Sequence, residues 1–218
     1  SNERVTWNNI SIVDPLFTIP TLIFIGLAIK TKRKLFSFFS IGWVVFYLSL
    51  GLVQYERALM TAYDLAELRG HNAKRLTLKP SFGNIILWKS IYEHEKTFYV
   101  DAIRTVQTST VCLGESIKIF DYQEHLPGLD RESQQASDIE RFRWFSQDYI
   151  GFDEEKNLVT DVRYSMLPNQ IEPMWGLVIN DLRDKNEHAI WWTGRDLDEG
   201  QWELFVKMLR GKECKVRS

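Results

Sequence analysis

The sequence predicts a membrane α-helical N-terminal part with two transmembrane helices, followed by a soluble α+β, mostly antiparallel β domain. Two observations lead to this fold class. Residues 10–53 carry almost no charge outside one short basic cluster, whereas most charged residues follow Tyr55. From residue 76 onward, short alternating or β-branched runs replace the long apolar segments. We therefore expect a transmembrane region at 1–54, an amphipathic connecting helix at 55–75 and a soluble domain at 76–218.

The bulk composition hides this division. The 218 residues are 44% hydrophobic and 26% charged, with a formal net charge of -2, which are values typical of a globular protein. Neither the near-neutral charge nor the arrangement of Lys and Arg forms the basic stripe of a nucleic-acid-binding protein. We expect no nucleic-acid partner.

Residues 35–53 (LFSFFSIGWVVFYLSLGLV) are the stronger transmembrane prediction. They contain no charged residue, and a stretch of about 20 apolar residues crosses the hydrocarbon core of a bilayer. A buried helix of a soluble domain would show a polar face at 3.6-residue spacing, and none is visible here. The sequence thus favours the lipid bilayer as the partner of this segment.

A second span is predicted at about 10–29. Pro20 is tolerated in membrane helices when neighbouring groups satisfy the freed carbonyl, and Asp14 would then lie near one interface. A re-entrant or interfacial helix is the alternative. The basic loop at 30–34 (KTKRK) belongs on the cytoplasmic side, which puts the soluble domain on the opposite, periplasmic or extracellular side. Arg57 and Arg69, which follow the second span closely, weigh against this orientation.

The segment 55–69 continues the second span as an amphipathic helix. Its apolar residues recur at helical spacing, and Gly70 is placed to end the helix as a C-terminal cap. The domain beyond it should contain a hairpin formed by 85–91 and 98–103, and helices at 133–145 and 198–209. Trp202, Phe205 and Leu209 should share one face of the last helix. Strands are expected at 76–78, 84–92, 97–106, 116–122, 158–164, 174–180 and 188–193.

Asp14 is the candidate functional residue. Asp as N-cap followed by Pro at the first helical position is a favoured way to begin a helix. An ionisable group at a membrane boundary is also costly and commonly functional. The two interpretations are compatible, because a capping carboxylate can also face a metal ion.

Other candidates for chemistry are less specific. The four histidines, His71, His94, His125 and His188, lack metal-site spacing and should be solvated loop residues. Asp161 and Arg163 should form an ion pair. Cys112 and Cys214 lack C-x-x-C spacing and should be two unrelated free thiols, although an oxidising compartment would allow them to pair. No nucleophile elbow, P-loop or dinucleotide-binding glycine pattern occurs.

Several passages resemble the YdjM-type inner membrane proteins, described as LexA-binding, predicted membrane-bound metal-dependent hydrolases. Residues 1–18, which contain Val13-Asp14-Pro15-Leu16, look like that family's "PFS-x-R … IDPLYT" passage. The later pieces Leu87-Trp88, Arg143-Trp144-Phe145-Ser146 and Thr160-Asp161-Val162-Arg163-Tyr164 look like its soluble tail. The resemblance covers most of the chain, and the Asp-Pro passage is its most specific part.

The resemblance implies a multi-pass inner membrane hydrolase whose divalent metal, such as Zn²⁺, activates water. Most ligands would come from histidine motifs on helices upstream of Ser1, and Asp14 would be a metal ligand or catalytic carboxylate. We expect the present chain, as a fragment without those helices, neither to bind the metal tightly nor to turn over substrate. The alternative is a non-enzymatic membrane protein whose β-rich domain binds a partner or envelope component. A transporter element is a weaker third hypothesis.

Overall fold

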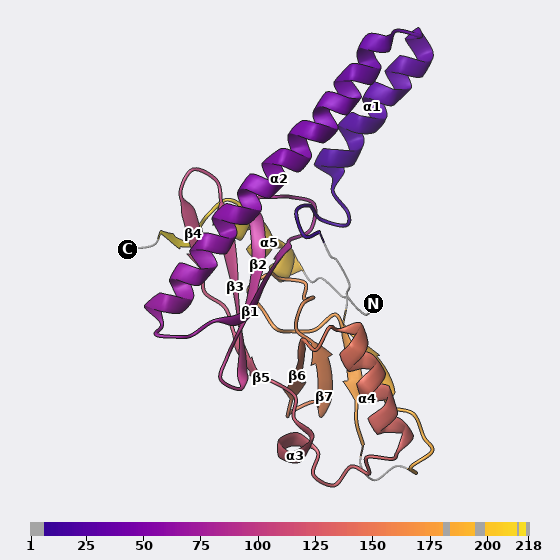
Figure 1. The fold of residues 1–218 in the computed structure, drawn as a ribbon, viewed down its shortest axis with the longest axis vertical. Helices are drawn as coiled ribbons and strands as arrows, with labels where there is room; N and C mark the ends of the chain where they lie inside the picture. Colours follow the sequence, from indigo (N-terminus) through magenta and orange to yellow (C-terminus); the bar gives the residue numbers. More distant parts are fainter. Residues whose placement is uncertain (1–6, 181–183, 195–198, 213, 217–218) are drawn as a thin grey trace.

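The computed structural model describes residues 7–180, 184–194, 199–212 and 214–216. A helical hairpin projects from one end of the molecule, and two antiparallel β-sheets with three helices form the rest (Figure 1). The predicted division into an N-terminal helical part and a β-rich part is therefore confirmed.

The first helix, α1 (Pro15–Thr31), starts later than the sequence analysis placed it. Asp14 is its N-cap and Pro15 its first residue, so residues 10–13 lie outside the helix. At 17 residues, α1 is about 25 Å long, which is shorter than the roughly 30 Å hydrocarbon core. The structure does not confirm α1 as a second transmembrane helix.

The second helix, α2 (Lys34–Leu68), has 35 residues and is long and apolar enough to cross a membrane. It runs without a break through the predicted span and the predicted amphipathic extension. Its end is the predicted glycine cap: Gly70 has φ 71°, its N–H donates to Glu67, and the N–H of His71 donates to Ala66. This pair of hydrogen bonds is a Schellman motif.

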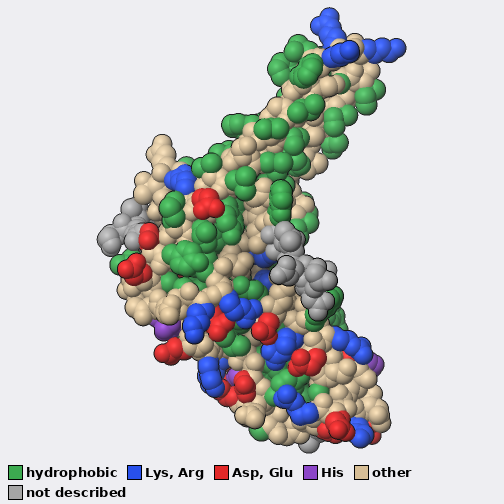
Figure 2. Space-filling view, in the orientation of Figure 1, with side chains coloured by type: hydrophobic (Ala, Val, Ile, Leu, Met, Phe, Trp, Pro, Cys, Tyr) green, Lys and Arg blue, Asp and Glu red, His purple; other side chains and the backbone are tan. Residues whose placement is uncertain are grey.

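The hairpin exposes its apolar side chains. No residue of α1 is buried, and few residues of α2 before Gly51 are. Hydrophobic side chains cover the visible face of the hairpin, and the lysines and arginine of the basic loop lie at its far tip (Figure 2). The exposed large residues of this region include Leu16, Ile19, Leu22, Ile23, Ile29, Leu35, Phe38, Phe39, Ile41, Val45, Phe46, Leu52 and Val53.

The larger sheet packs against the second half of α2. Its main strands follow the order β1-β2-β3-β4-β10, and β5 pairs with β3. Trp88 and Ile103 contact Ala58 and Ala62 of α2, whose small side chains allow a close approach of helix and sheet. The strand bounds are β1 (Lys74–Pro80), β2 (Leu87–His94), β3 (Thr97–Thr105), β4 (Ser109–Cys112), β5 (Ser116–Lys118) and β10 (Lys215–Val216).

The predicted hairpin in this sheet is confirmed. β2 and β3 pair from Leu87–Arg104 to His94–Thr97, and Glu95 turns the chain with φ 54°. The strands β4, β6 and β10 were not predicted, because runs of two to four residues are too short to show a clear alternation.

The smaller sheet has the order β6-β7-β8-β9 and is covered by α4 (Gln134–Phe145). The helix predicted at 133–145 is confirmed, with Ser133 as its N-cap. The remaining bounds are α3 (Tyr122–His125), β6 (Ile150–Asp153), β7 (Leu158–Asp161), β8 (Trp175–Val178) and β9 (Ile190–Thr193).

The last helix, α5 (Glu199–Leu209), agrees with the prediction for 198–209, except that residue 198 lies outside the described residues. The predicted common face is confirmed, because the ring of Trp202 stacks on that of Phe205 at 5.6 Å and Leu209 packs against the same cluster as Phe205. Phe205 and Met208 pack on Leu87 and Ala102 of the larger sheet, whereas Trp202 is 51% exposed. Trp202 points toward a cleft instead of the core, as described below.

The expectation of two free thiols is wrong. Cys112, at the end of β4, forms a disulfide with Cys214, which precedes β10. The two cysteines are 102 positions apart and no sequence signal linked them, because the adjacent positions of β4 and β10 in the sheet bring them together. Disulfides persist in oxidising compartments such as the periplasm.

Candidate functional site

Asp14 lies at the foot of the hairpin and is 3% exposed. Its Oδ1 accepts from the backbone N–H of Phe17 at 3.1 Å, which confirms the predicted N-cap. The hydroxyl of Tyr47, on α2, donates to the same carboxylate at 2.9 Å from Oδ1 and 2.8 Å from Oδ2. Asp14 therefore joins the two helices of the hairpin where they meet the β-sheets.

Asp14, Phe17 and Tyr47 do not by themselves form a metal site. Among the described residues, no group of three or more His, Cys, Asp or Glu side chains could hold an ion. A metal-binding role for Asp14 would need ligands from elsewhere in the protein, and that role stays a prediction.

The histidines lie apart from Asp14. The rings of His71 and His94 stack at 4.3 Å between centroids. The Tyr92 hydroxyl and His71 Nδ1 share a hydrogen bond of 2.9 Å. Both histidines are partly buried, so the expectation of solvated loop histidines is wrong for this pair. His188 is 67% exposed and contacts Asp138 at 2.8 Å.

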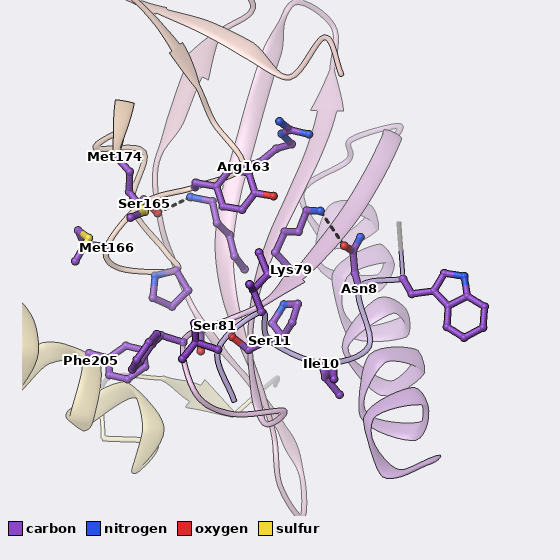
Figure 3. Close-up of a pocket in the computed structure, with 18 of the residues that line it drawn as sticks. Asn8, Ile10, Ser11, Lys79, Ser81, Arg163, Ser165, Met166, Met174 and Phe205 are labelled. Atoms are coloured by element: carbon purple, nitrogen blue, oxygen red, sulfur yellow. Dashed lines mark hydrogen bonds between the residues drawn. The ribbon is translucent and has the colours of Figure 1, made fainter. Parts of the chain in front are cut away.

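The larger feature is a cleft of about 600 Å³ beneath the hairpin. One wall is the segment 7–13 that leads into α1, the floor is formed by β1 and β2, and the opposite wall is the loop 163–174 with α5 (Figure 3). Most of the wall is apolar. The apolar lining residues are Trp7, Ile10, Ile12, Val13, Pro80, Phe82, Met166, Pro168, Met174, Trp202 and Phe205.

The segment 7–13 is held in place by contacts with both α2 and the sheet. A Cβ at Gly51 would collide with the carbonyl oxygen of Asn9, so glycine allows the segment to cross α2 closely. The N–H of Gly83 donates to the carbonyl of Val13 at 3.1 Å. This wall of the cleft is thus continuous with the first residue of α1.

Three cationic side chains lie in the cleft, and two come from paired strands. Lys79 on β1 lies directly opposite Lys89 on β2, so both side chains project to the same face of the sheet. Lys79 Nζ donates to Asn8 at 2.8 Å. Arg163 enters from the facing loop and pairs with Asp161 through contacts of 2.9 and 2.7 Å, which confirms the predicted ion pair.

Lys89 is the most unusual of these residues. It is 4% exposed, and its Nζ donates to Ser165 Oγ and to the Gln170 carbonyl, each at 2.7 Å. Burial lowers the pKa of Lys89 from 10.5 to about 7, although Asp161 and Glu115 oppose the shift. Burial, with a contribution from Arg163, lowers the pKa of Lys79 to about 8.

The cationic residues of the cleft and Ser165 were not predicted as a site from the sequence. One local signal was present: Lys89 occupies an inward position of a strand, between Leu87 and Ile91, where a buried apolar residue is expected. No signal linked it to Ser165, which lies 76 residues away and reaches it only through the fold.

Comparison with family models, curated proteins and solved structures gives no match to this chain. The resemblance to the YdjM-type proteins therefore stays a prediction, and the site is interpreted from its own geometry.

Proposed function

We propose that this chain is the membrane-anchored part of a hydrolase that takes an anionic, amphiphilic substrate from the membrane surface into the cleft beneath the hairpin. The observation that carries the proposal is the position of the cleft. One of its walls, residues 7–13, runs directly into the apolar hairpin, and its floor carries Lys79 and Lys89.

Anchoring is supported by the surface of the hairpin. In water, its exposed apolar side chains would form a continuous patch far larger than soluble monomers tolerate. We infer that α1 also enters the bilayer, with the basic loop on the cytoplasmic side. The Cys112–Cys214 disulfide supports a periplasmic location for the β-sheets.

The lining of the cleft supports the substrate class. Apolar walls favour burial of an acyl chain, and each buried CH₂ group contributes about 0.8 kcal/mol. Lys79 and Arg163 bring positive charge, and Lys89 adds part of a third charge because its pKa is about 7, against the one negative charge of Asp161. This combination matches a ligand with an apolar tail and an anionic group.

The hydrolase class rests on the resemblance to the YdjM-type proteins. That resemblance implies a divalent metal, which Asp14 would hold together with histidine ligands of the kind that family carries. Measuring bound Zn²⁺ in the protein encoded by the complete gene tests this part of the proposal. We expect Asp14→Asn to lower both metal content and hydrolysis; a longer protein that holds no metal would contradict it.

Binding can be tested on the 218-residue chain in detergent micelles. Trp202 lines the cleft, so a bound spin-labelled fatty acid should quench the part of the tryptophan fluorescence that a Trp202→Phe variant lacks. We expect Lys79→Gln to weaken binding about tenfold, which corresponds to about 1.4 kcal/mol. Lys118→Gln, at an exposed position outside the cleft, is the matched control. Equal affinities for both variants and the wild type would contradict the proposed site.

A second candidate function is supported by exposed aromatic residues on the smaller sheet. Trp191 of the edge strand β9 is 54% exposed, and Trp144 of α4 is 64% exposed. Exposed aromatic residues are common at binding surfaces. This observation favours the alternative of a β-rich domain that binds an envelope component.

Co-sedimentation with insoluble cell-wall polymer tests the second candidate. Trp191→Ser should reduce the sedimented fraction, while Leu113→Ser, at another exposed position, should not. If neither variant differs from the wild type, this surface does not bind the polymer.

A further inference from the structure

We propose that Ser165 is a nucleophile and Lys89 its general base, and that together they hydrolyse a carboxylic ester bound in the cleft. The inference uses the cleft of the proposed function as its substrate site. It does not use the metal, so the two parts can fail separately.

The two side chains have the geometry of a nucleophile and base. Lys89 Nζ lies 2.7 Å from Ser165 Oγ, within the range that proton transfer requires. A second hydrogen bond, from Nζ to the Gln170 carbonyl at 2.7 Å, fixes the direction of the amine. Both residues line the cleft, and Figure 3 shows the hydrogen bond at Ser165 facing its interior.

The surroundings of Lys89 favour its neutral form. Ordinary lysine is protonated near neutral pH and cannot accept a proton, but burial brings the pKa of Lys89 to about 7. Asp161 and Glu115 favour the charged form, but burial outweighs both of them. A substantial fraction of the amine is therefore a free base at neutral pH.

The loop that carries Ser165 fixes the position of its backbone and of its hydroxyl. Its hydroxyl donates to the carbonyl of Leu167 at 2.6 Å in the resting arrangement. When Lys89 is neutral, rotation of the hydroxyl directs the same proton to Nζ. The backbone is kept in position by a bridge between Ser165 and Pro173, so this rotation needs no movement of the loop.

The reaction balances with water as the only co-reactant. Ser165 Oγ forms a bond to the ester carbonyl carbon while its proton passes to Lys89 Nζ. The bond between carbonyl carbon and alcohol oxygen then breaks, and Lys89 returns the proton to the leaving alcohol. Water attacks the acyl-serine and gives a proton to Lys89; the acyl–Oγ bond breaks, Oγ regains the proton and a carboxylic acid is released.

A purely structural role for the pair is the competing explanation. Lys89 would then tie the loop 163–174 to β2 through Ser165 and Gln170, without chemistry. Both explanations predict that removal of Lys89 disturbs the loop. Only the catalytic one predicts a reactive serine.

Covalent labelling of the 218-residue chain in micelles separates them. A small fluorophosphonate should label Ser165 of the wild type, identified by peptide mass spectrometry, and labelling should speed up as the pH rises through about 7. Lys89→Met should abolish labelling. The decisive result is the labelling of the wild type, so it does not depend on whether a variant folds. The probe is small, so its reaction does not require that the cleft binds an amphiphile. Absence of label on Ser165 overturns the inference.

Turnover of p-nitrophenyl octanoate gives the second readout. Ser165→Ala should lower the rate at least roughly 100-fold. Ser137→Ala, an exposed serine on α4, should not change it. If the zinc-loaded longer protein hydrolyses the ester, a chelator abolishes that hydrolysis and Ser165→Ala has no effect on it, Ser165 is not the nucleophile and the metal-dependent hydrolase stands. If the spin-labelled fatty acid does not bind while Ser165 is labelled, the proposed substrate site fails instead.

Discussion

The two halves of α2 are one continuous helix in two different surroundings. Residues 34–53 expose large apolar side chains, and their few buried residues include Ser40, Tyr47 and Gly51. Residues 54–68 bury small residues, Ala58, Ala62 and Ala66, against the sheet. In the first half, the exposed side chains are almost all apolar. In the second half, the charged residues Glu56 and Glu67 are exposed beside Met60, Tyr63 and Leu68.

This difference shows that burial within the protein is a poor guide to where apolar residues are stable. The second half of α2 gains stability by removing area from water against Trp88 and Ile103. The first half has no such partner among the described residues on most of its surface, and the proposed anchoring assigns that role to lipid. On that proposal, the change near Gln54 lies at the membrane surface.

The largest effect is expected where the second half is fixed to the sheet. Arg69, just beyond α2, forms a two-point ion pair with Asp101 of β3 at 2.6 and 2.8 Å, and Asp101 is 1% exposed. Asp101→Asn should lower the free energy of unfolding by about 3 kcal/mol, the low end for a broken buried pair because Arg69 remains partly hydrated. Denaturant titration in micelles measures it. A loss no larger than that of Glu95→Gln, in an exposed turn, would contradict this role.

A charge in the first half tests the lipid environment. Ile41→Lys should reduce the membrane-inserted fraction, because a lysine near the centre of a spanning helix costs about 2.5 kcal/mol or more. Glu67→Lys, on the exposed face of the second half, should leave insertion unchanged. Membrane fractionation measures both variants. Equal insertion would break the distinction between the two halves.

Larger side chains at one position in each half of α2 test how closely each half is packed. Ala62→Leu should lower the free energy of unfolding by about 2 kcal/mol, because position 62 is 1% exposed and the sheet packed against it leaves no room for a larger side chain. Val45→Leu adds one methylene at a site that is 59% exposed and should change little. Thermal unfolding followed by circular dichroism compares the two. A similar shift for both would mean that residue 45 is also packed against protein.

The smallest predicted effect is a pH dependence confined to the β-sheet part. Between pH 7 and 10.5 the unfolded chain binds more protons at Lys89 than the folded chain, so stability rises with pH in this window. The rise from pH 7 to 8 should be about 1 kcal/mol. Lys89→Met should remove this contribution, while the smaller slope due to Lys79 remains. An unchanged slope would show that Lys89 is already solvated.

The sequence predicted those features that depend on local chemistry. The apolar run, the Asp14-Pro15 helix start, the Gly70 cap and the β2–β3 hairpin each follow from adjacent residues. The predicted span at about 10–29 begins before α1, because apolar residues continue on the N-terminal side of Asp14 and were counted with the helix.

The features that were missed depend on contacts between distant segments. The Cys112–Cys214 disulfide and the Lys89–Ser165 pair join residues 102 and 76 positions apart. Neither partner carries a motif of its own. The sheet register and the return of α5 bring these side chains together, and neither could be obtained from the sequence pattern.

Spin-label accessibility along α2 is the most direct test of its two environments. Nitroxide labels at 38, 41 and 45 and at 63 and 67 would be compared in reconstituted bilayers, with oxygen as the apolar and a nickel chelate as the polar relaxant. We predict high oxygen and low nickel accessibility at the first three positions, and the reverse at the last two. Uniform nickel accessibility along the helix would contradict a membrane boundary within α2 and the cleft position inferred from it.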